Sequence, residues 1–482
     1  MLRDVRHNIS DGLLGFAKAT GDGLHVKIGV SPVTSDKPIT VLGSMGADKI
    51  KSVLGLSPLA DAVMDSAQGG AARIFCIPVA ASTAGAIGEI THTGAGAGGL
   101  AVTGKPTNAF SIVVKITAKG GLNTAAFIYS IDGGYSYSDE ITVPLTGEYA
   151  LAGTGLTLKF TEATDEAQKA ESFLIDEVYS GTTTAPTMTN GDVLAAINKL
   201  KTFNQEFEFV HIVGASGVAL WLAVSEAQKE LMTEYHKPAF FLLEAAYPTA
   251  GADNDLTDWA LQMEADRKKV KNTDIQVCAS WGRLVRLDGT TQIVNLAGLA
   301  AGRYAMTKVS VSIGKTRDEA ELGFSKTRLM ELLPAGYDNT IIELLDVAGF
   351  LTFREYDGLD DIFIYHTKMM SPDGSDYRYA EDVRVRNKII RETRKEGLQL
   401  KNDDIDLEDI QGELDARAKF ISRPLDRMVD DEEISSYETT VDESCYETFL
   451  ENETMNVIIR YLSRGYIREV VVDIGRSALS AG

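Results

Sequence analysis

Long apolar runs, paired cysteines and clustered histidines are all scarce in this sequence of 482 residues. No stretch approaches the ~20 consecutive apolar residues of a membrane span, so we expect no membrane insertion. The six histidines never pair at metal-ligand spacing, which predicts no metal site. An odd cysteine count without CxxC pairing argues against a disulfide framework; the three cysteines are Cys76, Cys278 and Cys445.

The N-terminal residues lack the pattern of a secretory signal. Arg3, Asp4, Arg6 and His7 are followed by no apolar run within Met1–Ser10. A secretory signal needs an apolar stretch behind its charged start. We therefore expect a protein that is made in the cytoplasm.

Basic residues are outnumbered, with 47 Lys and Arg against 69 Asp and Glu and a net charge of −22. Phosphate binding depends on Lys and Arg, so wrapping of nucleic acid is not expected. The charge is also segregated. Residues 401–453 hold 18 acidic and 5 basic residues, whereas residues 384–395 hold six basic residues and one acidic residue. Such blocks are typical either of solvated faces or of a subunit that meets oppositely charged surfaces.

Three motifs resemble known chemical sites without completing them. Gly99–Lys105 has phosphate-loop spacing, but Pro106 stands where a magnesium-binding hydroxyl belongs and no helix follows. Gly214–Gly217 resembles a nucleophile elbow around Ser216, but Val218 replaces the second glycine. The acidic run from Asp403 to Asp409 lacks the glycine and the bidentate glutamate of an EF-hand. We therefore predict neither catalytic residues nor a cofactor.

Composition and periodicity divide the chain into zones of different structure. Residues 1–80 predict an α/β unit with strands at Leu24–Val30 and Ala72–Val79. Residues 84–187 are rich in Gly, Thr, Ser and Ala with β-branched runs, which predicts an inserted all-β domain. From Asn190 helical and β patterns alternate, as in a sheet covered by helices on both faces. The fold class is therefore a multi-domain α/β core, discontinuous in sequence, with an inserted all-β domain.

A second α/β region is predicted after about Asp338. It starts with a helix at 340–348, followed by strands at 350–354 and 361–367. Further elements are predicted as helices at 377–396 and 406–428, the latter interrupted at Pro424, and strands at 455–461 and 466–474.

The helix predicted at 377–396 carries a regular row of cations. Arg384, Lys388, Arg391 and Lys395 follow at spacings of 4, 3 and 4, which places them on one helix face. Val385 and Ile389 lie on another face, available for a core. The row indicates either a solvated face or a surface that docks onto an acidic partner.

Several segments, in this order along the chain, resemble the tail sheath family of contractile phage tails, phage-tail-like bacteriocins and injection systems. Tyr129–Ser138 of the insert also resembles the β decoration domains of phage tail proteins. The segments that resemble the sheath family are Gly69–Val79, Leu296–Tyr304, Asp346–Gly358, Ile362–Thr367, Asp376–Arg386 and Leu462–Asp473.

This resemblance implies a structural machine part and not an enzyme. Sheath subunits stack as hexameric rings around an inner tube, bounded by a baseplate and a tail terminator, and contract from a metastable extended state without ATP hydrolysis. The chain would then act in a virion tail or tail-like particle that is assembled in the bacterial cytoplasm. The implied parts are an N-terminal arm (1–25), a core α/β domain (26–83 and 188–337), a β-rich decoration domain (84–187), a C-terminal α/β domain facing the tube (338–469) and a C-terminal arm (470–482).

The resemblance also implies two sets of contact residues. A basic helix of the family faces the tube, and its position corresponds here to Arg384, Arg386, Lys388, Arg391, Arg394 and Lys395. Terminal strands pair with sheets of neighbouring subunits. The candidates for this exchange are Val5–Ser10 or Val26, Ile28 and Val30 at one end, and Val470, Val471, Val472, Asp473 and Ile474 at the other.

Two other classes of function compete with a sheath subunit. In the first, the β insert is an adhesin and the core is its platform in a surface-binding module. In the second, more distant alternative, the chain is an α/β hydrolase that acts through Ser216.

Overall fold

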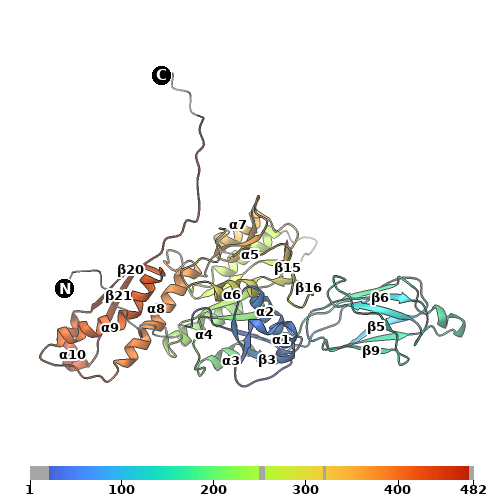
Figure 1. The fold of residues 1–482 in the computed structure, drawn as a ribbon, viewed down its shortest axis with the longest axis horizontal. Helices are drawn as coiled ribbons and strands as arrows, with labels where there is room; N and C mark the ends of the chain where they lie inside the picture. The colour runs from blue at the N-terminus through green and yellow to red at the C-terminus, as the bar shows by residue number, and fades with distance from the viewer. Residues whose placement is uncertain (1–20, 249–255, 318–321, 477–482) are drawn as a thin grey trace, which may run out of the picture. The chain divides into compact units, whose positions relative to one another are not determined.

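The computed structural model describes residues 21–248, 256–317 and 322–476 (Figure 1). The chain divides into two units, Met1–Arg391 and Glu392–Gly482, and helix α8 (Ala380–Gln399) contains the boundary. The candidate strand Val5–Ser10 lies outside the described residues.

An eight-stranded sheet forms the centre of the first unit, in the order β19-β18-β14-β13-β12-β1-β3-β2. The pairings from β3 through β18 are parallel, whereas β2 and β19 are antiparallel edge strands. The strands are β1 (His25–Val30), β2 (Ile39–Leu42), β3 (Arg73–Val79), β12 (Phe209–Ser216), β13 (Phe240–Ala245), β14 (Ile275–Cys278), β18 (Leu351–Glu355) and β19 (Ile362–Thr367).

Helices cover both faces of this sheet, as the alternation of patterns predicted. One core gathers apolar side chains of α3, α4, α5 and α7 with Val26, Ile212 and Leu243. On the opposite face, α2 and α6 contribute to two further cores. The helices are α1 (Ala47–Leu54), α2 (Pro58–Gln68), α3 (Asn190–Leu200), α4 (Val218–Thr233), α5 (Leu256–Arg267), α6 (Ala297–Met306) and α7 (Asn339–Ala348), with a 3-10 helix at Gly43–Met45.

The predicted boundary at 337/338 does not separate two sheets. Leu351 of β18 pairs in parallel with Cys278 of β14, so the strands after that boundary extend the main sheet. Parallel pairing across a long connection leaves no local sequence signal, which is why the boundary was misplaced. A small antiparallel sheet accompanies the main one, in the order β16 (Thr291–Asn295), β15 (Trp281–Val285), β17 (Leu329–Leu333).

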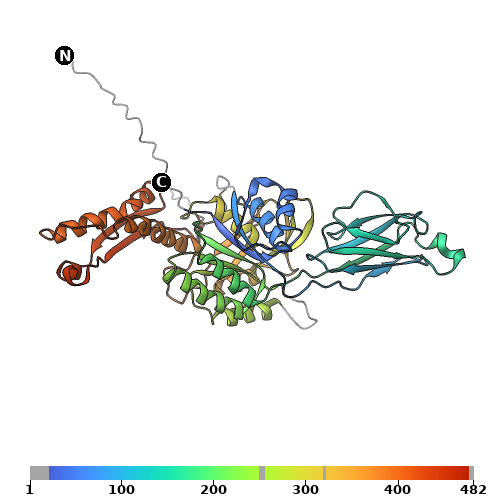
Figure 2. The ribbon, with the colours of Figure 1, turned by 90° about the horizontal axis from the view of Figure 1, so that it is seen from below.

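The insert segment, residues 84–187, contains two antiparallel sheets and a 3-10 helix at Glu166–Glu171 (Figure 2). Its own core includes Val114, Phe127, Leu158 and Phe173. The first sheet has the order β5 (Gly99–Gly104), β10 (Leu156–Thr161), β9 (Glu148–Leu151), and the second has the order β4 (Thr91–Thr93), β11 (Val178–Thr182), β6 (Ser111–Ala118), β7 (Ala126–Ser130), β8 (Ile141–Thr142).

The second unit packs helices against a two-stranded antiparallel ribbon of β20 (Ile434–Val441) and β21 (Val457–Ser463). Its core includes Leu414 and Ala418 of α9 (Ile410–Asp430) and Cys445 of α10 (Ser444–Asn452). Helix α9 continues through Pro424, where the sequence predicted an interruption. Proline removes one helical hydrogen bond, and here its ring is buried on the apolar face that holds the helix in place.

Candidate assembly interface

Helix α8 carries the predicted cation row, and its first turn is fixed in the body of the first unit. Glu381 and Asp382 stand at its N-terminus, where negative charge favours a helix. Ala380 and Val383 are buried in the core that α6 shares with the main sheet. The buried Glu381 carboxylate accepts a hydrogen bond from the Thr367 hydroxyl, which attaches the helix start to β19.

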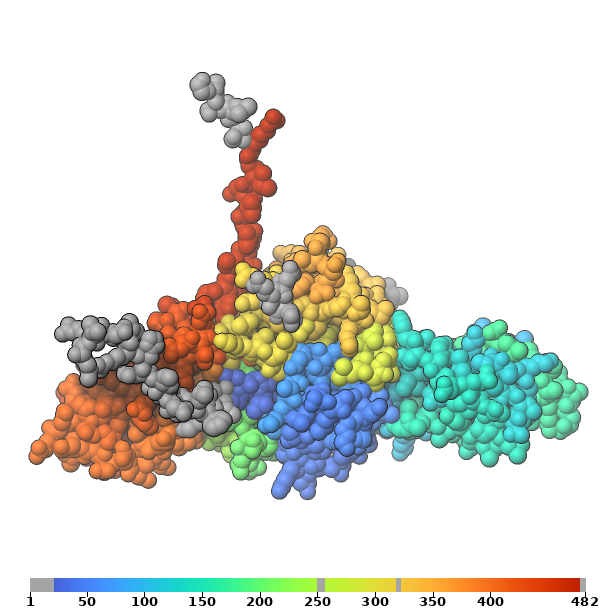
Figure 3. Space-filling view, viewed as in Figure 1, coloured from blue at the N-terminus to red at the C-terminus, as the bar shows by residue number. Residues whose placement is uncertain are grey.

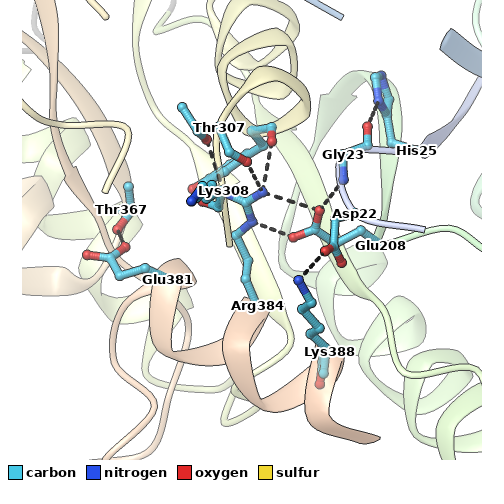
Figure 4. A network of polar contacts seen from close by, with 12 residues as sticks. Asp22, Gly23, His25, Glu208, Thr307, Lys308, Thr367, Glu381, Arg384 and Lys388 are labelled. Carbon is cyan, nitrogen blue, oxygen red and sulfur yellow. Dashed lines mark hydrogen bonds and ion pairs between the residues drawn. The ribbon is translucent and has the colours of Figure 1, made fainter. Parts of the chain in front are cut away.

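Arg384 is fully buried and points into the first unit (Figure 4). Its guanidinium forms a bidentate ion pair with the equally buried Glu208, with Nη2 3.2 Å from Oε2. Nη2 also donates to the carbonyl oxygens of Tyr304, at 2.8 Å, and of Thr307, at 3.1 Å. Burial opposes the charge, but Glu208 outweighs this effect and the pKa of Arg384 is raised. The side chain is committed to contacts within its own chain.

The next two cations of the row converge on one carboxylate near the start of the described chain. Lys388 Nζ lies 2.7 Å from Asp22 Oδ2, and Arg391 Nη2 lies 2.8 Å from Asp22 Oδ1. Both cationic side chains are buried. The prediction of an accessible row of cations is therefore wrong for Arg384, Lys388 and Arg391. Acids that are remote in sequence neutralise these three side chains inside the first unit.

The remaining basic residues of α8 are less enclosed. Arg386 lies on another face, where it pairs with Asp274 and covers the ring of Tyr377. Lys395 is half-buried and pairs with Glu392 at 2.7 Å, one turn earlier. Arg394 is also half-exposed. Surface that a partner could reach is thus concentrated at Arg394 and Lys395.

Strand β1 contains the N-terminal exchange candidates Val26, Ile28 and Val30. It pairs along one edge with β3 and along the other edge with β12. All three side chains are buried. The prediction of strand exchange is wrong for these residues, because both hydrogen-bonding edges of β1 are occupied within the chain.

The C-terminal segment after β21 is extended and exposed. Residues 466–474 were predicted to form a strand but have no regular secondary structure, and β21 pairs with β20. Residues 464–476 follow without regular secondary structure and form a thin extended chain, red in Figure 3. Val470, Val471, Val472 and Ile474 are between 71% and 92% exposed, and Asp473 is exposed as well. Four exposed aliphatic side chains within five residues are typical of a surface that is buried when a partner binds.

The β20–β21 ribbon offers the complementary feature. Each strand has one partner among the described residues, so each leaves one edge without a partner strand there. Helix α9 packs against β20 and contributes to the core of this unit. Unpaired strand edges are ready sites for pairing with another chain.

The residues of the hydrolase alternative serve other purposes. Ser216 Oγ donates to the carbonyl oxygen of Glu244 at 2.5 Å and accepts the indole N–H of Trp221 at 2.8 Å. His211, which is buried, bonds to Lys27 and Glu244. Ser216 therefore ties α4 to β13. Gly99–Gly104, the other near-motif, forms strand β5 and not a loop.

A buried polar row crosses three neighbouring strands of the main sheet. Lys27 Nζ of β1 donates to His211 Nδ1 of β12 at 2.5 Å, and His211 Nε2 donates to Glu244 Oε1 of β13 at 2.9 Å. Burial lowers the pKa of Lys27 to about 8 and raises that of Glu244 to about 7. Asp65 of α2 faces the same row and acts electrostatically on Lys27 and Glu244.

The described residues contain no group of three or more potential metal ligands. No helix within the described ranges is long and apolar enough to span a membrane.

Sequence reasoning missed the acids that neutralise α8. Asp22 stands between two glycines, a pattern typical of a turn. Glu208 is the single charged residue in the apolar run Phe207–Val213. A charge in a buried strand requires a partner, so Glu208 was the available signal that a cation of the chain is buried.

Two family models match most of the chain. The model described as DUF2586, N-terminal domain, matches residues 2–366, and that described as DUF2586, C-terminal domain, matches residues 376–479. A comparison with curated proteins found no match.

Solved structures with a similar fold include a sheath tail protein and chains of two assemblies in a contracted state. The sheath tail protein of Desulfitobacterium hafniense has a TM-score of 0.51 and 13% identity, with 96% of this chain and 100% of that chain covered. A chain of the PVC sheath complex, an extracellular contractile injection system in its contracted state, has a TM-score of 0.54 and 8% identity, with 99% of each chain covered. A chain of the contracted anti-feeding prophage baseplate has a TM-score of 0.50 and 11% identity, with 98% of each covered. The chain has the fold of these proteins, two of which are sheath proteins, and this confirms the resemblance that the sequence motifs indicated.

Proposed function

Because this chain belongs to the DUF2586 family and has the fold of tail sheath proteins, we propose that it is a structural subunit of a contractile sheath. The observation that carries the proposal is the end-to-end match to a sheath chain, with 99% of both chains covered. In the proposed assembly, subunits stack as hexameric rings around an inner tube, between a baseplate and a tail terminator. The sheath contracts from a metastable extended state and drives the tube into a target envelope.

The joints between subunits are proposed to be strand additions. The segment 466–474 provides an extended donor with exposed aliphatic side chains, and the β20–β21 ribbon of a neighbouring subunit provides unpaired edges. Main-chain hydrogen bonds give such a contact its strength, and alternate side chains give it register. A joint of this kind keeps two subunits linked while their bodies rotate.

The tube contact of α8 is proposed to lie at its two partly exposed cations near the end of the row. Arg394 and Lys395 have accessible surface, whereas Arg384, Lys388 and Arg391 neutralise acids of their own chain. Exposed charges steer association and set its salt dependence. The proposed tube contact is therefore a small electrostatic one at the end of the predicted row.

Electron microscopy of the purified chain tests the proposal. A sheath subunit should form rings or tubular polysheaths visible in negative stain. The same chain without Val470–Gly482 should stay folded and form neither. Wild-type protein that remains monomeric over a wide concentration range would contradict the sheath function.

The surface-binding alternative has one specific observation in its favour, the separate core of the insert segment. If that alternative held, the insert alone would bind target cells and the full chain would stay monomeric. Binding of labelled full chain and of insert-free chain to whole cells distinguishes it from the sheath function, because a sheath needs no such binding.

A further inference from the structure

Residues Gly21–Leu24 form a tight turn directly before the central strand β1. Leu24 N–H donates to the Gly21 carbonyl at 3.1 Å, and Gly21 and Gly23 both have a φ of 73°. A Cβ atom on Gly23 would lie 2.3 Å from the carbonyl oxygen of Ala305 in α6. Glycine alone permits both this left-handed conformation and this close approach. The turn is thus fitted to one place on the first unit.

The side chain at the tip of this turn is held by α8. Asp22 receives Lys388 at 2.7 Å through one oxygen and Arg391 at 2.8 Å through the other. The two cations are 8% and 5% exposed, and Asp22 is 19% exposed. Pairs so shielded from water are screened little by salt. The turn is consequently attached by a two-point electrostatic contact.

Helix α8 also holds the backbone of the turn, because its Arg384 pairs with Glu208 and Glu208 bonds to the turn. Glu208 Oε2 accepts the N–H of Gly23 at 2.6 Å, and the same carboxylate pairs with Arg384 (Figure 4). The N–H of Glu208 donates in turn to the carbonyl oxygen of Leu24 at 2.7 Å. Arg384 thereby fixes Glu208, and Glu208 fixes the backbone of the turn at Gly23 and Leu24.

We infer that α8 and Glu208 form a clamp for the turn at residues 21–24, and that this clamp fixes the point at which the chain before residue 21 joins the described part of the first unit. The inference rests on the proposed function, because the partner that would pull on residues 1–20 is a neighbouring copy of this chain. Strand β1 starts one residue after the turn and is bonded on both edges. A force applied to the chain before residue 21 would therefore act first on the contacts of the clamp and then on β1 in the centre of the main sheet. Three cations of the row act inside the subunit to hold its arm.

Hydrogen exchange on the dispersed full-length chain tests the clamp. Asp22→Asn removes the charge that α8 holds, and the double variant Lys388→Gln/Arg391→Gln removes the opposite partners. Asp36→Asn is the matched control, since Asp36 is an exposed acid that also lies in the N-terminal part of the first unit. Both clamp variants should speed exchange of the Gly23 and Leu24 amides about tenfold, with β1 unchanged, because local opening costs less without the ion pairs. Exchange that stays as slow as in Asp36→Asn overturns the clamp.

Assembly of the same proteins tests the consequence for the arm. If the clamp positions the arm, Asp22→Asn should form sheaths at least about tenfold less efficiently than wild type by sedimentation, while Asp36→Asn assembles normally. Normal assembly of Asp22→Asn despite faster exchange overturns the positioning role. Wild-type protein that does not assemble contradicts the proposed sheath function instead, and the exchange result then still decides whether the clamp exists.

Discussion

Glu208 and Arg384 form a fully buried ion pair, although 176 residues separate them in the sequence. Glu208 immediately precedes β12, and Arg384 lies in α8 beyond the last strand of the main sheet. Two charges lose their hydration when they are buried, and only mutual pairing and further hydrogen bonds offset this cost. Tyr304 and Thr307 provide those bonds through their carbonyl oxygens. The pair therefore links the middle of the first unit's chain to its C-terminal part.

Removal of one partner should be strongly destabilising. Glu208→Gln leaves the Arg384 guanidinium buried without a counter-charge, so we expect the free energy of unfolding to fall by about 3–5 kcal/mol. Urea denaturation followed by circular dichroism measures the change.

An exposed pair of the same chemistry provides the control for this measurement. Glu331 pairs with Arg283 at 2.7 Å near the surface, so Glu331→Gln should cost at most about 1 kcal/mol. Glu208→Leu/Arg384→Leu removes both buried charges and should be less destabilising than Glu208→Gln alone. Equal losses for Glu208→Gln and Glu331→Gln would contradict the buried-pair account.

The buried row Lys27–His211–Glu244 should make stability depend on pH. Burial raises the pKa of Glu244 from its ordinary 4.5 to about 7, so the folded state binds a proton more readily than the unfolded chain. The stability from this group is complete below pH 4.5 and is lost as pH rises through 7. We therefore expect the difference in unfolding free energy between wild type and Glu244→Gln to decline over that window, by on the order of 2–3 kcal/mol.

Unfolding titrations at half-unit pH steps measure this difference. Asp36→Asn, which changes an exposed acid outside the buried row, is the control measured alongside. A difference between wild type and Glu244→Gln that rises with pH would show that the sign is wrong.

The C-terminal segment should pair through one face. In an extended strand, Val470, Val472 and Ile474 share a face, and Val471 lies on the other face with Asp473. Val472 and Val471 are 71% and 76% exposed, so a substitution at either position should leave subunit stability unchanged. We expect Val472→Asp to prevent polysheath formation, because an apolar face must be buried on pairing, and Val471→Asp to permit it.

Sedimentation and negative-stain microscopy compare these two variants under the same conditions. The outcome against the model of strand addition is normal assembly of both variants. Equal loss in both would instead indicate that the two faces of the segment are buried on assembly.

Charge reversal at the partly exposed cations Arg394 and Lys395 of α8 should weaken binding of the tube and leave the fold of the subunit intact. Arg394→Glu/Lys395→Glu should reduce co-assembly of sheath and tube about tenfold at low salt, because charge at an interface rim governs association. Lys49→Glu reverses a surface charge on α1 that is at least as accessible and serves as the control. If the double variant still co-assembled with the tube as wild type does, Arg394 and Lys395 would not belong to the tube contact.

The insert segment should be removable. Thr83 and Thr187 are paired in an isolated antiparallel bridge, so the ends of the insert lie side by side. Replacement of the residues between them by Asn-Gly, a sequence favoured in two-residue turns, should leave the main sheet intact. Asp61 would lose its bond from Asn108 but keep Arg286 at 2.7 Å. A single cooperative thermal transition near that of wild type is the expected result, and an insoluble chain would refute it.

Periodicity predicted which residues of α8 share a face but not which way that face points. The spacing of Arg384, Lys388 and Arg391 places them together, as the structure has them. Their neutralising acids come from positions 22 and 208, and spacing within one helix carries no information about residues so distant. Tertiary pairing therefore turned a row expected at the surface into an internal contact.

Strand β1 was predicted correctly as a strand and wrongly as one available to a partner. The alternation of Val26, Lys27 and Ile28 is typical of a strand with one solvated face. Lys27 is instead buried, because His211 and Glu244 continue its hydrogen bonds across β12 and β13. In the segment of altered composition, by contrast, the strands pair among themselves and share a core.

The close approach of Thr83 and Thr187, where the chain enters and leaves the insert, has an evolutionary consequence. Since the backbone enters and leaves the insert at adjacent points, sequences of very different length can occupy this site without a change in the path of β3 or α3. Selection on the insert and selection on the rest of the subunit are thereby uncoupled. Exchange of one insert for another would leave the strand pairings of the main sheet unchanged.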